Sequence, residues 1–516
     1  MKKIKFVIAL LLVIPLFQSC QDFAELEKNQ NKPNQVPAGL ALNGVLNDMY
    51  ERPWSVEHRQ NQYWACNYNY YGTNEYWANA PLNYQTLKNV IKMEEEAIRG
   101  GAGEVNPYAA LGKFARALFY VRMSQRVGDL PLDKALLGLN ELKPTYDTQK
   151  KIYTLALNWL DQANTELSQL ITVNDKTLQG DIYLGNDLAK WRKVVNSFKL
   201  RVLISLSKKE SDAELNVKGK FAEMLNNPAK YPLMTSNADN MQYVYNGTTN
   251  LYPLNPGNRG FDKNRYNMAA TYMSLLTTLK DPRVFVVANP AKKKIADGVA
   301  PSDFAAYVGA SSGESLDNMS TNAQKGEYSY ANQKRYYSTL IGPEPAVQIG
   351  YAEQSFNIAE GINRGWATGN AETFYNEGVK ASMLFFGVKD GAVITITESD
   401  NDAVIGSVTA DVTAYLNQAS VKYAGNNAAG LKQILEQKYL GFFQQSGQEA
   451  YFNFRRTGIP TFLVGPGTGN SGVIPKRWLY PVAEKVNNEA MYSEAVGRQF
   501  GGAGDNLNSD LWLVKN

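Results

Sequence analysis

The sequence is poor in the two side chains that most often build catalytic and metal sites. It has a single histidine, His58, and two cysteines, Cys20 and Cys66, among its 516 residues. Zinc and redox-metal centres usually draw on several such side chains placed close together. The sequence therefore predicts no zinc or redox-metal site and no cofactor, and it leaves calcium sites built from oxygen ligands alone open. With so few thiols, the stability of the fold has to come mainly from packing.

The sequence also lacks a strong net charge and, beyond its N-terminus, any long apolar run. Its formal net charge is +4, and this falls by three to +1 if Lys2, Lys3 and Lys5 are removed with the N-terminal segment. Nucleic-acid binding requires clustered positive charge, so no nucleic-acid partner is expected. No later stretch approaches the roughly 20 apolar residues of a transmembrane helix. With 44% hydrophobic residues, the chain can instead bury a sizeable core.

The N-terminus has the parts of a secretory signal peptide. Three lysines precede an apolar run of 12 residues, from Phe6 to Phe17, which is too short to cross a bilayer. The sequence Gln18-Ser19-Cys20 follows, and a small residue directly before a cysteine resembles the bacterial lipobox, in which the cysteine is acylated. An ordinary signal peptide with an incidental cysteine is the alternative, because Phe17 and Gln18 are not usual lipobox residues.

These features divide the chain into three parts. We expect residues 1–19 to be a signal peptide, Cys20 to be the lipid anchor, and residues 20–37 to be a lipid-anchored tether. Asp22, Glu25 and Glu27 resemble the acidic segment that marks surface export in some lipoproteins. The rest of the chain, 38–516, would form the folded domain.

Apolar residues recur at helical spacing along most of this domain, and the helices are joined by loops rich in glycine, proline and asparagine. Paired helices of this kind are typical of tetratricopeptide-like units, which bury their apolar faces by stacking on neighbours. A short β-branched run from Ala392 to Thr397 alternates with period two and predicts a small hairpin strand. The predicted helical stripes are Leu111, Phe114, Leu118 and Val121; Ile152, Leu155, Trp159, Ala163, Leu167 and Leu170; Trp191, Val195, Phe198, Val202 and Leu206; Ile349, Ala352, Phe356, Ala359 and Ile362, followed by Phe374 to Phe385; and Leu431 to Gln445 with Gln448 to Arg455.

Six segments, spread in order through nearly the whole chain, carry a specific resemblance. They are DLAKWRKVVNSFKLRVLISLSKK (Asp187 to Lys209), the turn DPR (Asp281 to Arg283), YAEQSFNIAEGINRGW (Tyr351 to Trp366), QKYLGFFQQSGQEAYFNFRRTGIP (Gln437 to Pro460), PKRWLYPVAEKVNNEAMY (Pro475 to Tyr492) and the terminal DNLNSDLWL. These segments resemble the SusD/RagB family of nutrient-binding outer-membrane lipoproteins, especially its SusD-like group two branch.

The resemblance implies both a fold and a partner. The fold would be mainly α, a right-handed superhelix of tetratricopeptide-like helix pairs with long irregular insertions and at most a small β-hairpin, and residues 38–516 would form one SusD-like domain. The partner would be a SusC-like TonB-dependent transporter barrel. The protein would sit on the outer membrane through its lipid, face the cell exterior and hold its ligand over the mouth of the barrel. No catalysis is implied.

Aromatic side chains are concentrated among asparagines between Tyr63 and Tyr84. A sugar ring has an apolar C–H face and a rim of hydroxyls, so flat aromatic rings and amide groups suit it. Half or more of these rings could equally belong to the core, where we expect Tyr63 and Trp64. The residues predicted to contact a ligand in this segment are Asn69, Tyr70, Tyr71, Asn74 and Trp77.

Two further tyrosine clusters are weaker candidates for the same role. One contains Tyr243, Tyr245 and Tyr252, and the other lies beside Lys334 and Arg335. From these clusters we predict Tyr245 and Tyr336 as ligand contacts, although their loops could equally face the barrel.

Three short motifs invite a catalytic interpretation, and none is convincing. Gly309 to Gly313 matches G-x-S-x-G, but no strand precedes it and His58 lies upstream, where an α/β-hydrolase has no base. Gly467 to Gly472 matches G-x-G-x-x-G without a following helix. The run Glu94-Glu95-Glu96 points its carboxylates in different directions on a helix. Asp400-Asn401-Asp402 is likewise too short for a calcium loop and reads as a solvated turn.

The sequence thus predicts a binding protein and not an enzyme. Capture of a glycan or oligosaccharide is the first hypothesis. Capture of a peptide or another nutrient by the same architecture is the second, and a helical-repeat adaptor that binds only protein is the third. A surface glycan-degrading enzyme is the remaining alternative.

Overall fold

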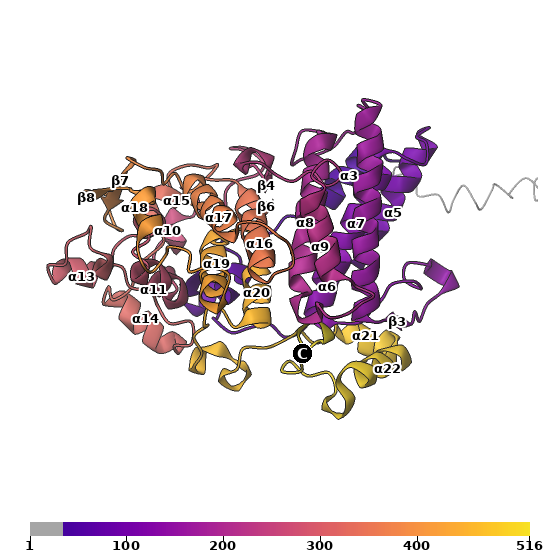
Figure 1. The fold of residues 1–516 in the computed structure, drawn as a ribbon. Helices are drawn as coiled ribbons and strands as arrows, with labels where there is room; N and C mark the ends of the chain where they lie inside the picture. The colour runs from indigo at the N-terminus through magenta and orange to yellow at the C-terminus, as the bar shows by residue number, and fades with distance from the viewer. Residues whose placement is uncertain (1–34, 516) are drawn as a thin grey trace, which may run out of the picture.

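The computed structural model describes residues 35–515. Cys20, the predicted signal peptide and most of the predicted tether lie outside the described residues. Within 35–515, none of the helices combines the length and the apolar character needed to cross a membrane. The described chain consists mainly of helices, with four two-stranded sheets between them. Figure 1 shows the helices gathered into two groups with the irregular segments beside them.

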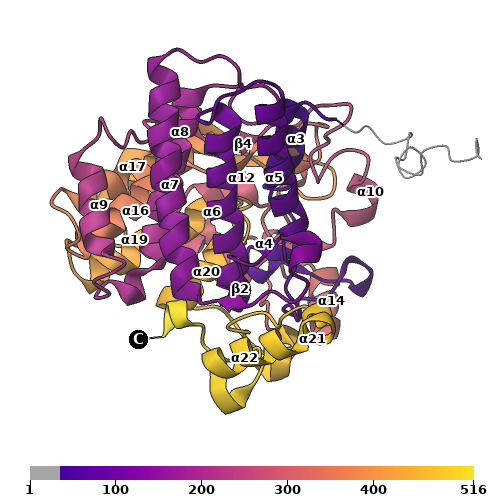
Figure 2. The ribbon, with the colours of Figure 1, turned by 90° about the vertical axis from the view of Figure 1, so that its right-hand side faces the viewer.

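The first helical group forms from the N-terminal part of the chain and lies on the right of Figure 1. Its long helices begin at capping residues: the Asn106 side chain accepts from the Ala109 amide, and Thr148 caps the next long helix. Neighbouring long helices pack side by side in sequence order, as the turned view in Figure 2 also shows. The group comprises α3 (Ala38–Asn47), α5 (Tyr84–Arg99), α6 (Pro107–Val127), α7 (Gln149–Thr172), α8 (Leu188–Ser205) and α9 (Val217–Asn226).

The stripes predicted for this group are confirmed. The predicted apolar residues of α6 and α8 are all buried, and those of α7 are buried or half-buried. Phe114 of α6 contacts both Trp191 and Phe198 of α8, each at 5.7 Å between ring centroids. Helices α6 and α7 pack against each other across the loop that follows Gly128.

The second helical group lies at the centre of Figure 1 and consists of α16 (Tyr351–Asn363), α17 (Ala371–Phe385), α19 (Ala428–Gly441) and α20 (Glu449–Thr457). Helices α16 and α17 approach closely because Gly378 carries no side chain; a Cβ atom there would lie 2.7 Å from the Phe356 ring. The segment from Gly365 to Gly369 separates these helices. One predicted position is different, since Ile349 lies in a strand and α16 begins at Tyr351.

Charged side chains join the two groups in the interior. The Arg201 guanidinium of α8 forms a bidentate ion pair with Glu353 of α16. Glu360, also on α16, pairs with Arg456 of α20. Burial opposes the ionisation of Glu360, but Arg456 and the neighbouring Arg364 outweigh it and lower the pKa of this carboxyl to about 2. Because each buried charge has a partner, the junction fixes the packing of one group on the other.

The insertions between the helices carry short helices and paired strands. Most lie on the left of Figure 1, and the C-terminal pair lies at the bottom. The short helices are α4 (Val56–Gln60), α10 (Arg259–Asp262), α11 (Ala270–Thr278), α12 (Arg283–Val287), α13 (Lys292–Ala296), α14 (Leu316–Gln324), α15 (Gln333–Tyr336), α18 (Val412–Asn417), α21 (Val482–Asn487) and α22 (Glu489–Phe500). The antiparallel pairs are β1 (Trp64–Cys66) with β5 (Tyr266–Met268), β2 (Leu130–Pro131) with β3 (Tyr146–Asp147), β4 (Met241–Tyr243) with β6 (Ala346–Ile349), and β7 (Val393–Thr397) with β8 (Val404–Thr409).

The hairpin predicted near Ala392 is confirmed as β7 and β8, whereas the other three pairs were not anticipated. Each of these has at most four residues per strand, and β1 and β5 are separated by about 200 residues in sequence. A period-two pattern cannot be recognised in so short a strand. These ladders matter because they tie insertions from distant parts of the chain to one another.

We predict that Arg456→Met lowers the free energy of unfolding by about 3–5 kcal/mol, since it leaves the Glu360 carboxylate buried without its main partner. The midpoint of urea unfolding, followed by circular dichroism, measures this change. Lys432→Met is the matched control because it breaks an exposed ion pair, with Glu436, and should leave the midpoint unchanged. The double variant Arg456→Met with Glu360→Met should lose less than the single variant. A single variant as stable as the parent would contradict this role.

Candidate functional site

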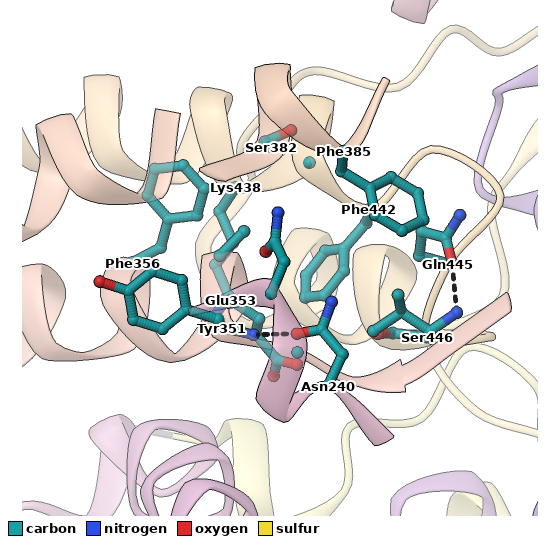
Figure 3. A pocket seen from close by; sticks show the side chains of 15 residues that line it. Asn240, Tyr351, Glu353, Phe356, Ser382, Phe385, Lys438, Phe442, Gln445 and Ser446 are labelled. Carbon is teal, nitrogen blue, oxygen red and sulfur yellow. Dashed lines mark hydrogen bonds between the residues drawn. The ribbon is translucent and has the colours of Figure 1, made fainter. Parts of the chain in front are cut away.

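A narrow cleft lies between α16, α17 and α19 and is shown in Figure 3. It is lined by Asn240, Tyr351, Phe385 and Phe442, and the Tyr351 amide donates to the Asn240 side chain at 2.8 Å. Its free volume is about 30 Å³, which is space for one or two water molecules. The Lys438 ammonium at its wall donates to two asparagine side chains. This cleft is therefore too small and too well satisfied to hold a sugar.

A wider groove of about 600 Å³ runs between the segment that contains Arg335 and strand β7. Its aromatic side chains, Phe285 and Phe386, are 3% and 2% exposed, so they offer no ring face to a ligand. The Arg335 guanidinium is already paired with Glu344 at 2.7 Å. Volume alone thus does not make this groove a sugar site.

The aromatic segment singled out in the sequence is held in place by hydrogen bonds from asparagine side chains. Strand β1 pairs with β5, and the Asn67 side chain extends this pairing by donating to the Asn264 carbonyl at 2.9 Å and to Asn267 Oδ1 at 2.7 Å. The side chain of Asn74 accepts from the Cys66 amide at 2.8 Å and donates to the Cys66 carbonyl at 2.9 Å. The residues between Cys66 and Asn74 are thereby closed into a projecting loop.

A single turn of 3₁₀ helix, η2 (Asn69–Tyr71), forms the tip of this loop. Gly72 ends the turn with a φ of 109°, and a Cβ atom there would lie 2.8 Å from the Arg59 guanidinium. Arg59 lies beneath the loop, where it donates to the Tyr71 carbonyl at 3.2 Å and stacks over the Trp64 ring. The tip is therefore fixed from below while its outer face remains open.

The outer face carries a group of aromatic rings that we call the tyrosine platform: Tyr68, Tyr70, Tyr71, Phe261 and Tyr266. Tyr70 is 82% exposed, Phe261 76% and Tyr68 45%, while Tyr71 and Tyr266 are half-buried. The Tyr71 ring is the centre, with centroids 5.3 Å from Tyr70, 6.3 Å from Tyr68 and 6.2 Å from Tyr266. The exposed side chain of Asn69 forms no hydrogen bond within residues 35–515 and lies beside these rings.

Helix α10, which lies between strands β4 and β5 in the sequence, completes the platform. The Tyr71 hydroxyl donates to the Phe261 carbonyl at 2.7 Å. Arg259 forms a bidentate pair with Asp402 in the β7–β8 turn, at 2.6 and 2.7 Å, and Lys263 donates to the carbonyl of Asp400. The predicted solvated turn at Asp400 to Asp402 is thus a support for α10.

One carboxylate lies within this arrangement with an unsatisfied oxygen. Asp262 is 5% exposed, and its buried Oδ1 has no hydrogen-bond partner. Burial raises the pKa of this carboxyl to about 6, and the neighbouring Tyr337 hydroxyl offsets the effect only in part. Asp262 is thus a poorly solvated acid directly beneath an exposed aromatic surface, next to Tyr71 and Tyr266.

The predicted contacts separate into two sets. Asn69, Tyr70 and Tyr71 lie together on the platform, with side chains accessible to a ligand. Asn74 is 6% exposed and uses its amide to close the loop, so it is not available to bind. Trp77 stacks on Trp478 at 3.6 Å and donates its indole N–H to the Arg477 carbonyl at 3.0 Å, so that its ring works in packing.

The contacts predicted from the other two clusters lie in the interior. Tyr245 is 7% exposed and shares a hydrogen bond of 2.8 Å with the Tyr50 hydroxyl. Tyr336 is fully buried, and its ring meets that of Trp54 at 4.8 Å. Neither offers a face to solvent, because the apolar rings of these loops pack beneath the surface. Tyr63 and Trp64, expected in the core, are buried there.

Several platform residues were missed in the sequence. The residues that were missed, on the platform or directly beside it, lie in one short stretch without a local excess of aromatic residues: Phe261, Asp262, Arg265 and Tyr266. The pairing of β1 with β5 brings them to the loop tip. A single exposed phenylalanine between polar neighbours is the one signal that the sequence offered.

The motifs set aside as catalytic are structural. His58 is fully buried, and burial lowers its pKa to about 3, so the ring is neutral. Glu94, Glu95 and Glu96 pair with three different cations, Arg116, Lys92 and Arg99. The glycine-rich segments around Gly313 and Gly465 pack backbone against backbone, since a Cβ atom at either position would clash with the other segment.

Comparison with known proteins gives a consistent picture. A family model for SusD-like proteins, described as starch-binding and associating with the outer membrane, matches residues 29–481. No curated protein is similar enough to this chain to count as a relative. Among solved structures, a SusD homologue from Bacteroides fragilis is 30% identical, with a TM-score of 0.80, over 93% of this chain and 100% of the other.

Two further structures extend the comparison. A Bacteroides vulgatus outer membrane protein, described as involved in nutrient binding, is 28% identical with a TM-score of 0.77, over 93% of this chain and 100% of the other. A chitin-binding SusD homologue from Flavobacterium johnsoniae is 20% identical with a TM-score of 0.69, over 93% of this chain and 99% of the other. The last of these shows the shared fold alone.

We predict that Asp262→Asn stabilises the protein at pH 8 by about 1–2 kcal/mol, because it removes a carboxylate whose ionisation is opposed by burial. A carboxyl with a raised pKa in the folded state costs stability above that pKa, here about 6, and costs nothing below its ordinary value of 3.8. The gain should therefore be full at pH 8 and nearly absent at pH 4. Urea unfolding at both pH values measures it.

The exposed Asp317 supplies the control for this experiment. Asp317→Asn should change the free energy of unfolding by less than about 0.5 kcal/mol at either pH, as is usual for exposed substitutions. If Asp262→Asn is destabilising at pH 8, the ionised carboxylate stabilises the folded protein, and our assignment of Asp262 as a destabilising buried acid is wrong.

Proposed function

Because the chain belongs to the SusD-like family, we propose that it is a cell-surface lipoprotein that captures a glycan or oligosaccharide on its tyrosine platform and delivers it to a SusC-like TonB-dependent transporter. The observation that carries the proposal is the open face of the platform. Three of its rings, Tyr68, Tyr70 and Phe261, stay exposed although the chain buries most of its other aromatic side chains. Exposed aromatic groups of this size on a folded protein usually mark a binding surface.

The chemistry of the platform suits a sugar. An aromatic ring packs against the C–H face of a pyranose, and each such contact contributes about 0.5–1.5 kcal/mol. The free amide of Asn69 and the Tyr70 hydroxyl can donate to and accept from the ligand hydroxyls at the rim. No step in this process makes or breaks a covalent bond, so capture needs no catalytic residue. The Flavobacterium homologue described as chitin-binding offers a precedent for sugar binding on this fold.

The anchor and the partner complete the proposal. Cys20 would carry the lipid, residues 1–19 would be removed, and residues 20–37 would tether the single domain 38–516 to the outer membrane. The helical groups would provide a rigid surface for the transporter, and the platform would hold the ligand above its entrance. The family description, starch-binding and associating with the outer membrane, supports this placement.

We predict that Tyr70→Ala weakens glycan binding about tenfold and leaves the thermal midpoint unchanged, because the ring is 82% exposed and supports nothing else. Isothermal titration of the glycan that binds most tightly in a broad polysaccharide panel measures the dissociation constant. Leu139→Ala, which removes a 92% exposed side chain from the segment between α6 and α7, is the matched control and should bind normally.

Trp77→Ala separates a ligand contact from a packing residue. It should lower the thermal midpoint, since it removes the stack on Trp478.

Unchanged binding by Tyr70→Ala in the presence of a glycan ligand would place the site elsewhere on the molecule. Binding of a peptide pool and of no glycan would favour the alternative of peptide capture.

We predict that Cys20→Ser abolishes incorporation of radiolabelled palmitate and moves the protein from the membrane fraction to the soluble fraction, because the acylated thiol is lost. Cys66→Ser is the control and should keep both label and location, since this thiol is buried and donates to the Tyr68 carbonyl. Labelled Cys20→Ser protein would rule out the proposed anchor.

A further inference from the structure

Two arginines at the platform have no hydrogen-bond acceptor and no carboxylate as a partner within the described residues. Across residues 35–515, Arg52 and Arg265 are the arginines whose guanidinium forms neither an ion pair nor a hydrogen bond. Arginines that lack an ion pair elsewhere still donate to amide or carbonyl oxygens, as Arg126, Arg192 and Arg455 do. Guanidinium groups with five donors are seldom left unused in a folded protein. The donors of these two guanidinium groups are therefore free to bind an acceptor from outside the described chain.

Both arginines border the tyrosine platform. The Arg265 guanidinium stacks over the Tyr68 ring at 4.6 Å from the centroid. Arg52 is exposed and lies two residues before Trp54, whose ring centroid is 6.5 Å from that of Tyr266, the opposite member of the platform. Burial raises the pKa of the Tyr266 hydroxyl, and the positive charge of Arg52 partly offsets this effect. The two cations thus lie near different ends of one aromatic strip that runs from Tyr68 through Tyr71 to Tyr266.

A third arginine adds to the positive charge beneath the strip. Arg59 donates to the Tyr71 carbonyl and stacks over Trp64, and no carboxylate pairs with it. Glu57, on the same short helix, acts on Arg59 without forming an ion pair. The aromatic strip is thereby surrounded by three guanidinium groups, none of which is neutralised by a carboxylate in contact with it.

On the basis of the proposed function, we infer that the platform takes an anionic saccharide, one whose rings carry carboxylate or sulfate groups. A planar guanidinium binds a carboxylate or a sulfate through two parallel hydrogen bonds, which a neutral hydroxyl cannot accept with equal strength. The rings between the arginines pack on the sugar faces, and the free ends of Arg52 and Arg265 meet the charged substituents.

The acid nearest the platform does not cancel this field. Asp262 is 5% exposed and faces Tyr337 beneath the surface, whereas Arg52 is exposed and Arg265 is half-buried. Asp400 and Asp402 are already paired, with Lys292 and Arg259 respectively, and Glu57 forms no ion pair with any of the three arginines. A ligand approaching from solvent therefore meets guanidinium groups and ring faces before it meets a carboxylate.

The experiment compares two ligands that differ only in charge. The full-length protein in detergent is titrated with an oligogalacturonate and with the methyl ester of the same oligosaccharide, and then with a sulfated oligosaccharide and its desulfated form. We expect at least one charged form to bind at least tenfold more tightly than its neutral counterpart. Raising sodium chloride from 20 to 500 mM should weaken the charged form and leave the neutral form unchanged.

Variants locate the effect on the platform. Arg265→Gln and Arg52→Gln should each weaken binding of the charged form about tenfold and change binding of the neutral form less than twofold. Arg99→Gln, on α5 in the first helical group, removes an exposed arginine remote from the platform and should change neither. The thermal midpoint of each variant shows that folding is intact.

The outcomes distinguish this inference from the proposed function. If neutral glycans bind, Tyr70→Ala weakens them and the charge of the ligand makes no difference, the protein captures sugars but the anionic preference is wrong. If neither charged nor neutral saccharides bind, both are wrong. Charge-dependent binding that survives both arginine substitutions would also overturn the inference, because the charge would then be read elsewhere.

Discussion

The architecture depends on charge pairing in the interior, where the two helical groups meet. Arg201 binds Glu353 across the junction, and Glu360, two turns further along the same helix, binds Arg456 of α20. Isolated charges at these positions would cost several kcal/mol each, so the helices can pack only in the register that pairs them all. Lys438 illustrates the same constraint: burial lowers the pKa of its ammonium to about 8, and the two asparagine oxygens that accept from it hold it in place. Apolar stripes bring the helices together, and the charges select one arrangement.

Amide side chains play the corresponding part in the insertions. The loop tip that carries Tyr70 has only a three-residue ladder beneath it, and Asn67 and Asn74 supply the hydrogen bonds that a longer sheet would provide. A side-chain amide can serve as both donor and acceptor, so the Asn74 side chain alone can close the loop that begins at Cys66. The asparagine-rich composition of the segment therefore has two causes. Asn69 is free at the surface, whereas Asn67 and Asn74 are structural, and residue type alone does not distinguish them.

The sequence predicted the helical scaffold well and the site only in part, for one physical reason. Stripes such as Trp191 to Leu206 depend on contacts whose spacing is set by the helix itself, and a local pattern therefore reveals them. The platform depends on contacts between residues about 200 positions apart, such as Tyr71 with Phe261. Local reasoning placed Tyr70 and Tyr71 in a loop because glycine and polar residues flank them. It could not tell that Trp77, a few residues later, finds Trp478 to stack on, or that Tyr336 is enclosed by Trp54.

The geometry also constrains how strongly the platform can hold a ligand by itself. Three accessible rings at about 1 kcal/mol each, with a few solvent-exposed hydrogen bonds, correspond to a dissociation constant on the order of 1 mM. The Tyr70 and Phe261 rings are largely exposed, so the platform leaves one side of a bound sugar in water. Tighter capture requires either a ligand with charges that engage the surrounding arginines or a second surface that covers the exposed side. Under the proposed function, the transporter would supply that second surface and would enclose the ligand between the two proteins.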